Sequence, residues 1–104
     1  MQIINLTPHT INLNSGASYE ASGTVARVTS NMEETGNIEG IPVYSQTFGD
    51  IEGLPEPSQD VIYIVSSIVK AATIRKDVVA PATSHQDVIR NEKGHIVSVP
   101  GFIS

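Results

Sequence analysis

The hydrophobic pattern is strongest in the middle of the chain, where a strand-like run passes directly into a helical segment. Residues 61–65 are Val-Ile-Tyr-Ile-Val, a β-branched and aromatic run that is typical of a strand covered on both faces. Ser66 or Ser67 can cap a helix that follows, because a serine oxygen accepts a free N–H group of the first turn. The apolar pattern continues over 68–72, and two cations at 75–76 suit the end of a helix. We expect this stretch to organise the fold, with a core that consists of Val61, Ile62, Ile64, Val65 and Ile68.

Shorter apolar or alternating segments lie on both sides of this centre. They predict strands, in chain order, at residues 2–6, 9–14, 24–29, 43–48, 77–81, 88–90 and 95–99. The polar residues 31–36 read as a loop. The related sequences at 36–42 and 49–55 read as two similar turns that flank the strand at 43–48, and Asn-Glu-Lys-Gly at 91–94 predicts a hairpin turn. The last apolar pair, 102–103, is expected to fold back onto the body.

Strands outnumber helices in this pattern, and most connections are short. We therefore expect one α+β domain over residues 1–104, with a twisted, mainly antiparallel β-sheet and one short α-helix packed on it. Hydrophobic residues make up 39% of the chain and aromatic residues only 5%, so the core must consist mainly of Ile and Val. A chain of this size has little core to spare, and an oligomeric interface would add to it.

Targeting signals and membrane segments are not apparent in the sequence. The chain has no cysteine, no cationic start followed by an apolar signal segment, and no apolar run near the roughly 20 residues that span a bilayer. These features predict a cytoplasmic protein that does not bind membranes.

Charge is distributed unevenly along the chain. Residues 1–60 contain eight acids and one base, Arg27, whereas residues 61–104 contain five bases and three acids. The net charge of −5 argues against a nucleic-acid polymer as partner, because such binding depends on many phosphate contacts. A small phosphorylated ligand remains compatible with the sequence, since two or three well-placed cations suffice to hold it.

Signatures of catalysis are weak. His9, His85 and His95 lack the spacing of metal ligands, and a zinc site is not expected without cysteine. Ser66 lacks the glycines of a nucleophile elbow, and the glycine-rich phosphate-binding motifs are missing. Acids at 39, 50, 52 and 56 do not follow a calcium-loop pattern and are expected to form a solvated rim. We therefore expect neither an enzyme nor a cofactor.

Binding is the remaining class of function, and seven side chains are candidates for it. Tyr63 offers a ring for stacking on a purine, and three arginines offer forked donors for phosphates. Hydroxyl and amide groups could read ribose or base edges. The candidate ligand-binding residues are Arg27, Tyr63, Ser66, Thr73, Arg75, Arg90 and Asn91. Each also has a structural alternative: a strand tyrosine packs in a core, Arg27 pairs with a nearby acid, and Asn91 forms a turn.

The order of several short motifs resembles a widespread family of small phage and prophage proteins. The similarity covers nearly the whole chain, through Asn-Leu-Thr-Pro-His at 5–9, Ser-Gly-Thr-Val-Ala-Arg-Val at 22–28, Gly-Leu-Pro at 53–55, Tyr-Ile-Val-Ser at 63–66, Arg-Lys-Asp-Val-Val-Ala-Pro at 75–81, Arg-Asn-Glu at 90–92 and Val-Pro-Gly-Phe at 99–102.

The family resembles the first-described Thoeris anti-defence proteins. These are oligomeric sponges that bind cyclic ADP-ribose isomers, made by immune TIR-domain enzymes, without cleaving them, and some members also bind cyclic oligonucleotides. The resemblance implies a homo-oligomer built from dimers in the host cytoplasm, with a pocket between protomers. It also implies an aromatic ring on the base and arginines on the pyrophosphate. Tyr63, Arg27 and Arg90 match these roles, with Asn91 and Thr73 as weaker candidates.

Two other readings remain open. The chain could be a small phage structural or assembly protein without a small-molecule ligand, whose interfaces would explain the Ile and Val content. A phosphodiesterase-like enzyme is a third reading.

Overall fold

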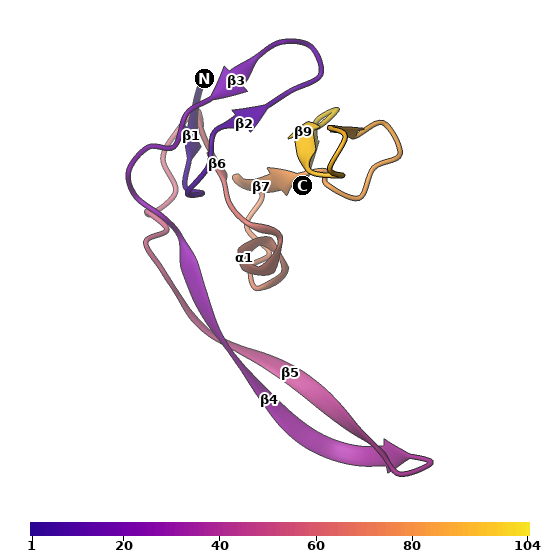
Figure 1. Cartoon of the computed structure of the whole chain (residues 1–104). Coiled ribbons are helices and arrows are strands. Elements are labelled where there is room, and N and C mark those ends of the chain that lie inside the picture. The colour runs from indigo at the N-terminus through magenta and orange to yellow at the C-terminus, as the bar shows by residue number, and fades with distance from the viewer.

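The central strand β6 (Val61–Ile64) lies inside a four-stranded sheet in the computed structural model, which describes all 104 residues. The order of the strands is β1 (Gln2–Asn5), β6, β7 (Val78–Pro81) and β10 (Phe102–Ile103). Both β1 and β7 run parallel to β6, and only β10 is antiparallel to its neighbour (Figure 1). The α+β class is confirmed. The expectation of mainly antiparallel pairing is wrong for this sheet.

Helix α1 (Ser67–Ala71) explains the parallel pairing. It connects β6 to β7, and two parallel neighbours require a crossover of this kind. Of the two serines predicted as candidate caps, Ser66 is the N-cap, and its side chain accepts a hydrogen bond from the backbone N–H of Val69. The helix is shorter than expected, because it ends at Ala71 and not beside the cations at 75–76.

Two small hairpins lie beside the sheet. Strands β2 (Ile11–Asn12) and β3 (Ser18–Tyr19) form one, and β8 (Ile89–Arg90) and β9 (Ile96–Ser98) form the other around the predicted turn at 91–94. The fold-back of the last apolar pair is confirmed by the pairing of β10 with β7. The structure contains no helix with the length and hydrophobicity that crossing a bilayer requires.

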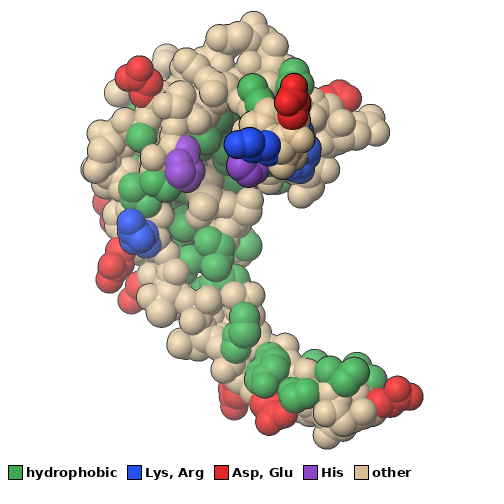
Figure 2. Space-filling view, in the orientation of Figure 1, with side chains coloured by type: hydrophobic (Ala, Val, Ile, Leu, Met, Phe, Trp, Pro, Cys, Tyr) green, Lys and Arg blue, Asp and Glu red, His purple; other side chains and the backbone are tan.

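A long hairpin projects from this body and gives the molecule a hooked outline (Figures 1 and 2). It consists of β4 (Arg27–Ile38) and β5 (Ile41–Glu52), and we call it the arm. The predicted loop at 31–36 is wrong, because these residues belong to β4. Their polarity is compatible with a strand since the arm has no buried face there, and pairing with β5 supplies their backbone hydrogen bonds.

The two related glycine-containing sequences have different roles. In the first, Glu39 and Gly40 both have positive φ, 52° and 85°, as a tight two-residue hairpin turn requires at the tip of the arm. In the second, Gly53 has a φ of 80° at the base of the arm. A Cβ atom there would lie 2.5 Å from the carbonyl oxygen of Val25. Glycine therefore permits two chain segments to cross closely where the arm meets the body.

The core lies where the base of the arm, β6 and α1 meet. Its buried cluster consists of Leu6, Ala26, Tyr63, Val65, Val69 and Val78, against which Ile4, Val28, Ile51, Leu54 and Val61 pack. Of the expected core residues, Ile64 and Val65 are fully buried, and Val61 and Ile62 are half-buried. Ile68 is wrong as a core residue, because it is 43% exposed.

Candidate functional site

A cavity of about 280 Å³ lies between the base of the arm and α1. We call it the arm-base cavity. Its walls are mainly apolar, with one cation and two hydroxyl groups, and it is lined by Leu6, Thr7, Pro8, Val25, Ala26, Arg27, Val28, Ser66, Ile68 and Val69. Apolar walls with a few polar groups are typical of small-molecule sites.

The Asn-Leu-Thr-Pro-His motif forms one wall of this cavity through a buried polar network. The side-chain amide of Asn5 donates to the backbone oxygens of His9 and Tyr19, at 2.7 and 2.9 Å. Its Oδ1 accepts from the backbone N–H of Thr7 at 2.9 Å and from the Thr7 hydroxyl at 2.7 Å. Asn5 is thus buried with both ends of its amide satisfied. The network fixes the chain where it leaves β1 and orients Thr7 and Pro8 at the cavity.

Arg27 and Ser66 bring candidate polar groups to the same cavity. Arg27 begins β4 and is exposed, and its guanidinium forms no ion pair with any acid of the chain, although Glu52 lies opposite it across the hairpin. Its five N–H donors therefore remain available to an anion. The Ser66 oxygen accepts from Val69, which leaves its hydroxyl proton free to donate.

Arg90 and Asn91 lie at a second, polar cleft formed by the turn between β8 and β9. This turn cleft is an open hollow of about 590 Å³, lined by Arg90, Asn91, Glu92, Lys93 and His95. Nη1 of Arg90 donates to the backbone oxygen of Gly94 at 2.8 Å, and Oδ1 of Asn91 accepts from the backbone N–H groups of Lys93 and His95. Both side chains hold the turn, and Arg90 keeps further donors that face solvent.

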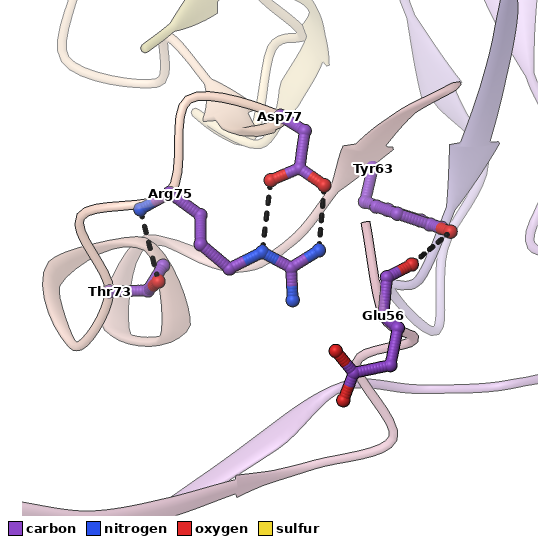
Figure 3. Close-up of polar contacts among 5 residues, drawn as sticks. All are labelled: Glu56, Tyr63, Thr73, Arg75 and Asp77. Carbon is purple, nitrogen blue, oxygen red and sulfur yellow. Dashed lines mark hydrogen bonds and ion pairs between the residues drawn. The ribbon is translucent and has the colours of Figure 1, made fainter. Parts of the chain in front are cut away.

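Tyr63 does not offer its ring to a ligand in the single chain. The residue is 3% exposed and belongs to the core cluster. Its hydroxyl donates to the backbone oxygen of Glu56 at 3.5 Å (Figure 3). The structure thus corrects the expectation that Tyr63 lies at the edge of a pocket, because in the single chain its ring packs in the core cluster.

Arg75 and Thr73 lie outside both hollows and stabilise the loop that leads into β7. Nε and Nη2 of Arg75 donate to the two carboxylate oxygens of Asp77, at 3.0 and 2.6 Å (Figure 3). This double hydrogen bond raises the pKa of Arg75 and lowers the pKa of Asp77. The Thr73 hydroxyl oxygen accepts from the backbone N–H of Arg75 at 3.2 Å. In the single chain Arg75 therefore forms an ion pair within the loop, and its role in phosphate binding stays a prediction.

No family model, curated protein or solved structure matches the chain. The resemblance to Thoeris anti-defence proteins thus stays a prediction, and the site has to be argued from its geometry.

The structure separates the seven candidates into three groups. Arg27 and Ser66 share the arm-base cavity, Arg90 and Asn91 share the turn cleft, and the remaining three have structural roles in the single chain. Sequence reasoning missed the apolar walls of the cavity, above all Pro8, Val25 and Ile68. The sequence contained a signal for two of them. Pro8 follows the first predicted strand, and Val25 lies on the same face of the predicted strand 24–29 as Arg27.

Proposed function

We propose that the protein binds a cyclic nucleotide signal, such as a cyclic ADP-ribose isomer, and sequesters it without cleaving it. The observation that carries this proposal is the arm-base cavity, which combines apolar walls with the unpaired guanidinium of Arg27. A base can lie against the apolar walls while the arginine binds a phosphate. No carboxylate or imidazole lines the cavity, so its residues suit holding a ligand more than general acid–base hydrolysis.

The size of the cavity bears on how a ligand would fit. Its volume of about 280 Å³ is slightly below the range for small-molecule sites, about 300–1,000 Å³. A base with its ribose can occupy such a space, and the pyrophosphate would then extend past Arg27 toward solvent or toward a second protomer. The sponge would act in the cytoplasm of the infected host, where it would lower the free concentration of the immune signal.

A charge-removal variant tests the role of Arg27. For Arg27→Gln we expect the dissociation constant of the bound nucleotide to rise roughly ten- to a hundredfold, because a hydrogen bond to a charged group contributes about 1.5 to 3 kcal/mol. Titration calorimetry against cyclic ADP-ribose isomers and cyclic dinucleotides measures this change. Lys76→Gln is the matched control, since Lys76 is an exposed cation outside both hollows and its loss should leave the affinity unchanged.

The turn cleft is tested in the same titration. For Arg90→Ala we expect weaker binding with an intact fold if the ligand reaches this cleft, and an unchanged affinity would remove Arg90 from the site. Turnover of the ligand beyond one equivalent of protein would contradict sequestration and favour a phosphodiesterase-like enzyme.

A second candidate function is that of a small phage structural or assembly protein without a ligand. The uncovered arm favours it, because long exposed hairpins suit contacts with other chains. Calorimetry separates the two candidates: heat on titration with a nucleotide supports the sponge, and no heat of binding across the whole panel supports the structural protein.

In cells, the sponge is also expected to protect phage from a TIR-based defence.

A further inference from the structure

The arm is unusually exposed for part of a folded chain. The radius of gyration is 16.1 Å, whereas a compact domain of about 100 residues has about 13 Å. Between residues 31 and 42 every residue is exposed. An isolated two-stranded hairpin is at best marginally stable in water, so the outer part of the arm is expected to need a partner surface.

One face of the arm carries apolar side chains along much of its length. Residues that lie opposite each other in the hairpin, or two positions apart along a strand, share a face. By this pairing Val28, Ile51, Phe48, Met32 and Tyr44 lie on one face, together with the polar Ser30, Gln46 and Glu34. The first two pack against the core. The other three continue the stripe outward without cover, with Met32 69% and Tyr44 56% exposed. Figure 2 shows hydrophobic side chains along the concave side of the arm and acidic ones mainly on its outer side.

The accessible surface of the chain is larger than expected for a folded monomer of this length, which supports a permanent partner. The accessible surface is 7166 Å², whereas a folded monomer of this length is expected to expose about 5,700 Å². The excess is about 1,500 Å² per chain. In a dimer this would give an interface of roughly 3,000 Å² in total, which lies in the range of permanent homodimers, about 2,000–5,000 Å².

Charge argues against contact between two arms. The arm contains one base, Arg27, and five acids, at 33, 34, 39, 50 and 52, for a net charge of −4. Two arms side by side would bring like charges together. An arm therefore fits a surface that combines exposed apolar residues with cations.

The hairpin of β8 and β9 has this combination. Its apolar residues Ile89, Ile96 and Val97 are each between 41% and 49% exposed, and Arg90 and Lys93 are exposed cations at its turn. Neither cation forms an ion pair in the chain. In Figure 1 this hairpin lies across an open concave side from the arm of its own chain. The same chain thus presents two uncovered hairpins of opposite charge.

We propose that the arm of one copy docks on the β8–β9 hairpin of a second copy, and that the second arm docks reciprocally to form a two-fold dimer. A two-fold contact uses both surfaces on both chains, so it covers both arms and leaves no free end for further growth. The inference does not depend on ligand binding, and it holds whether or not the protein takes a nucleotide.

The first test measures the molar mass of the full chain in solution by ultracentrifugation over a dilution series. The wild-type protein is expected to have twice the mass of one chain at tens of micromolar. Met32→Ser is expected to raise the dissociation constant of the dimer at least tenfold. Asn31→Ser is the matched control, because Asn31 neighbours Met32 and lies on the opposite face of the arm. Since both side chains are exposed in the single chain, circular dichroism should show an unchanged fold.

The second test reverses charges on each surface. Glu34→Lys should weaken the dimer, because Glu34 shares the face of Met32, and so should Arg90→Glu with Lys93→Glu. Mixing the two charge-reversed proteins, or combining all three changes, should restore association. A monomer at every wild-type concentration would overturn the proposal, as would a dimer that is insensitive to these changes or that the combined reversal does not restore.

Discussion

Arg75 shows how a residue that looks like a ligand-binding cation in the sequence can have a structural partner close by, in this case Asp77. The arginine follows the helical segment in a loop, where a cation could equally bind a phosphate. Its partner lies only two residues further along, and the two side chains meet in a double hydrogen bond with both residues partly shielded from solvent. An acid at that spacing, directly before a buried strand, is the signal that favoured a local ion pair.

The pair makes stability depend on pH in a defined direction. The hydrogen bonds from Arg75 lower the pKa of Asp77 in the folded state. The carboxylate therefore stabilises the fold above its unfolded pKa, about 3.9, and this contribution is lost as the pH falls through the folded value. For Asp77→Asn we expect a loss of roughly 0.5 to 1 kcal/mol at pH 7 in urea unfolding, and a smaller loss of stability below pH 4 than in the wild type.

The control for this prediction is Glu20→Gln, which removes an exposed carboxylate without an ion pair. An Asp77→Asn protein that matches the wild type in stability at pH 7 and along the acid limb would show that the pair contributes nothing.

Gly53 is the residue on which the attachment of the arm depends. For Gly53→Ala we expect a loss of at least about 1 to 3 kcal/mol, because the residue has a φ of 80° and the added Cβ would meet the backbone of Val25. Gly36→Ala is the matched control, since Gly36 lies in the arm with open space around it and without a positive φ. Thermal unfolding of both variants checks the difference, and equal stability would contradict the close crossing at the base of the arm.

At the scale of elements, the central strand and helix are predictable because local chemistry and packing favour the same structure there. The apolar run 61–65 has to be buried, and Ser66 supplies the cap. The hairpin at 91–94 is predictable for a similar reason, since its turn residues favour one local geometry. In the arm, the strand at 43–48 is predicted from the sequence, whereas residues 31–36 of β4 were missed because their polar side chains lack the alternating pattern of a half-buried strand.

The parallel pairing of the central sheet could not be read from the pattern either. Buried strands look alike in parallel and antiparallel sheets, and the predicted helix after residue 66 did not by itself show that the strands on either side of it pair in parallel. The candidate site was predictable only in part, because a cavity depends on segments that meet in space. Arg27 and Ser66 meet there from positions 39 residues apart, and the wall formed by Pro8 comes from a third segment.

Helix α1 offers a direct test at this scale. Ser66→Ala is expected to cost about 1 kcal/mol, because it removes the side-chain acceptor for the N–H of Val69 at the start of the helix. Ser67→Ala replaces the neighbouring serine inside the helix, where alanine has the higher propensity, and should be neutral or slightly stabilising. Urea unfolding distinguishes the two. If both variants behaved alike, the cap would not contribute to the fold.

At the scale of the whole molecule, the two proposals connect through Ile68. This residue is 43% exposed and lines the arm-base cavity. A second copy that covers Ile68 would add walls to the cavity and enlarge it beyond the volume of one chain. Such a dimer would supply exposed aromatic rings, such as Tyr44, where the single chain buries Tyr63.

Retention of an intact ligand tests the central claim most directly. The purified protein is incubated with a panel of cyclic ADP-ribose isomers and cyclic dinucleotides, free ligand is removed by filtration, and the retained protein is heated. Mass spectrometry then identifies and quantifies what is released. We expect one of these nucleotides to be released, chemically unchanged and in an amount comparable to that of the protein. Release of no nucleotide, or of a cleaved product, would contradict the claim.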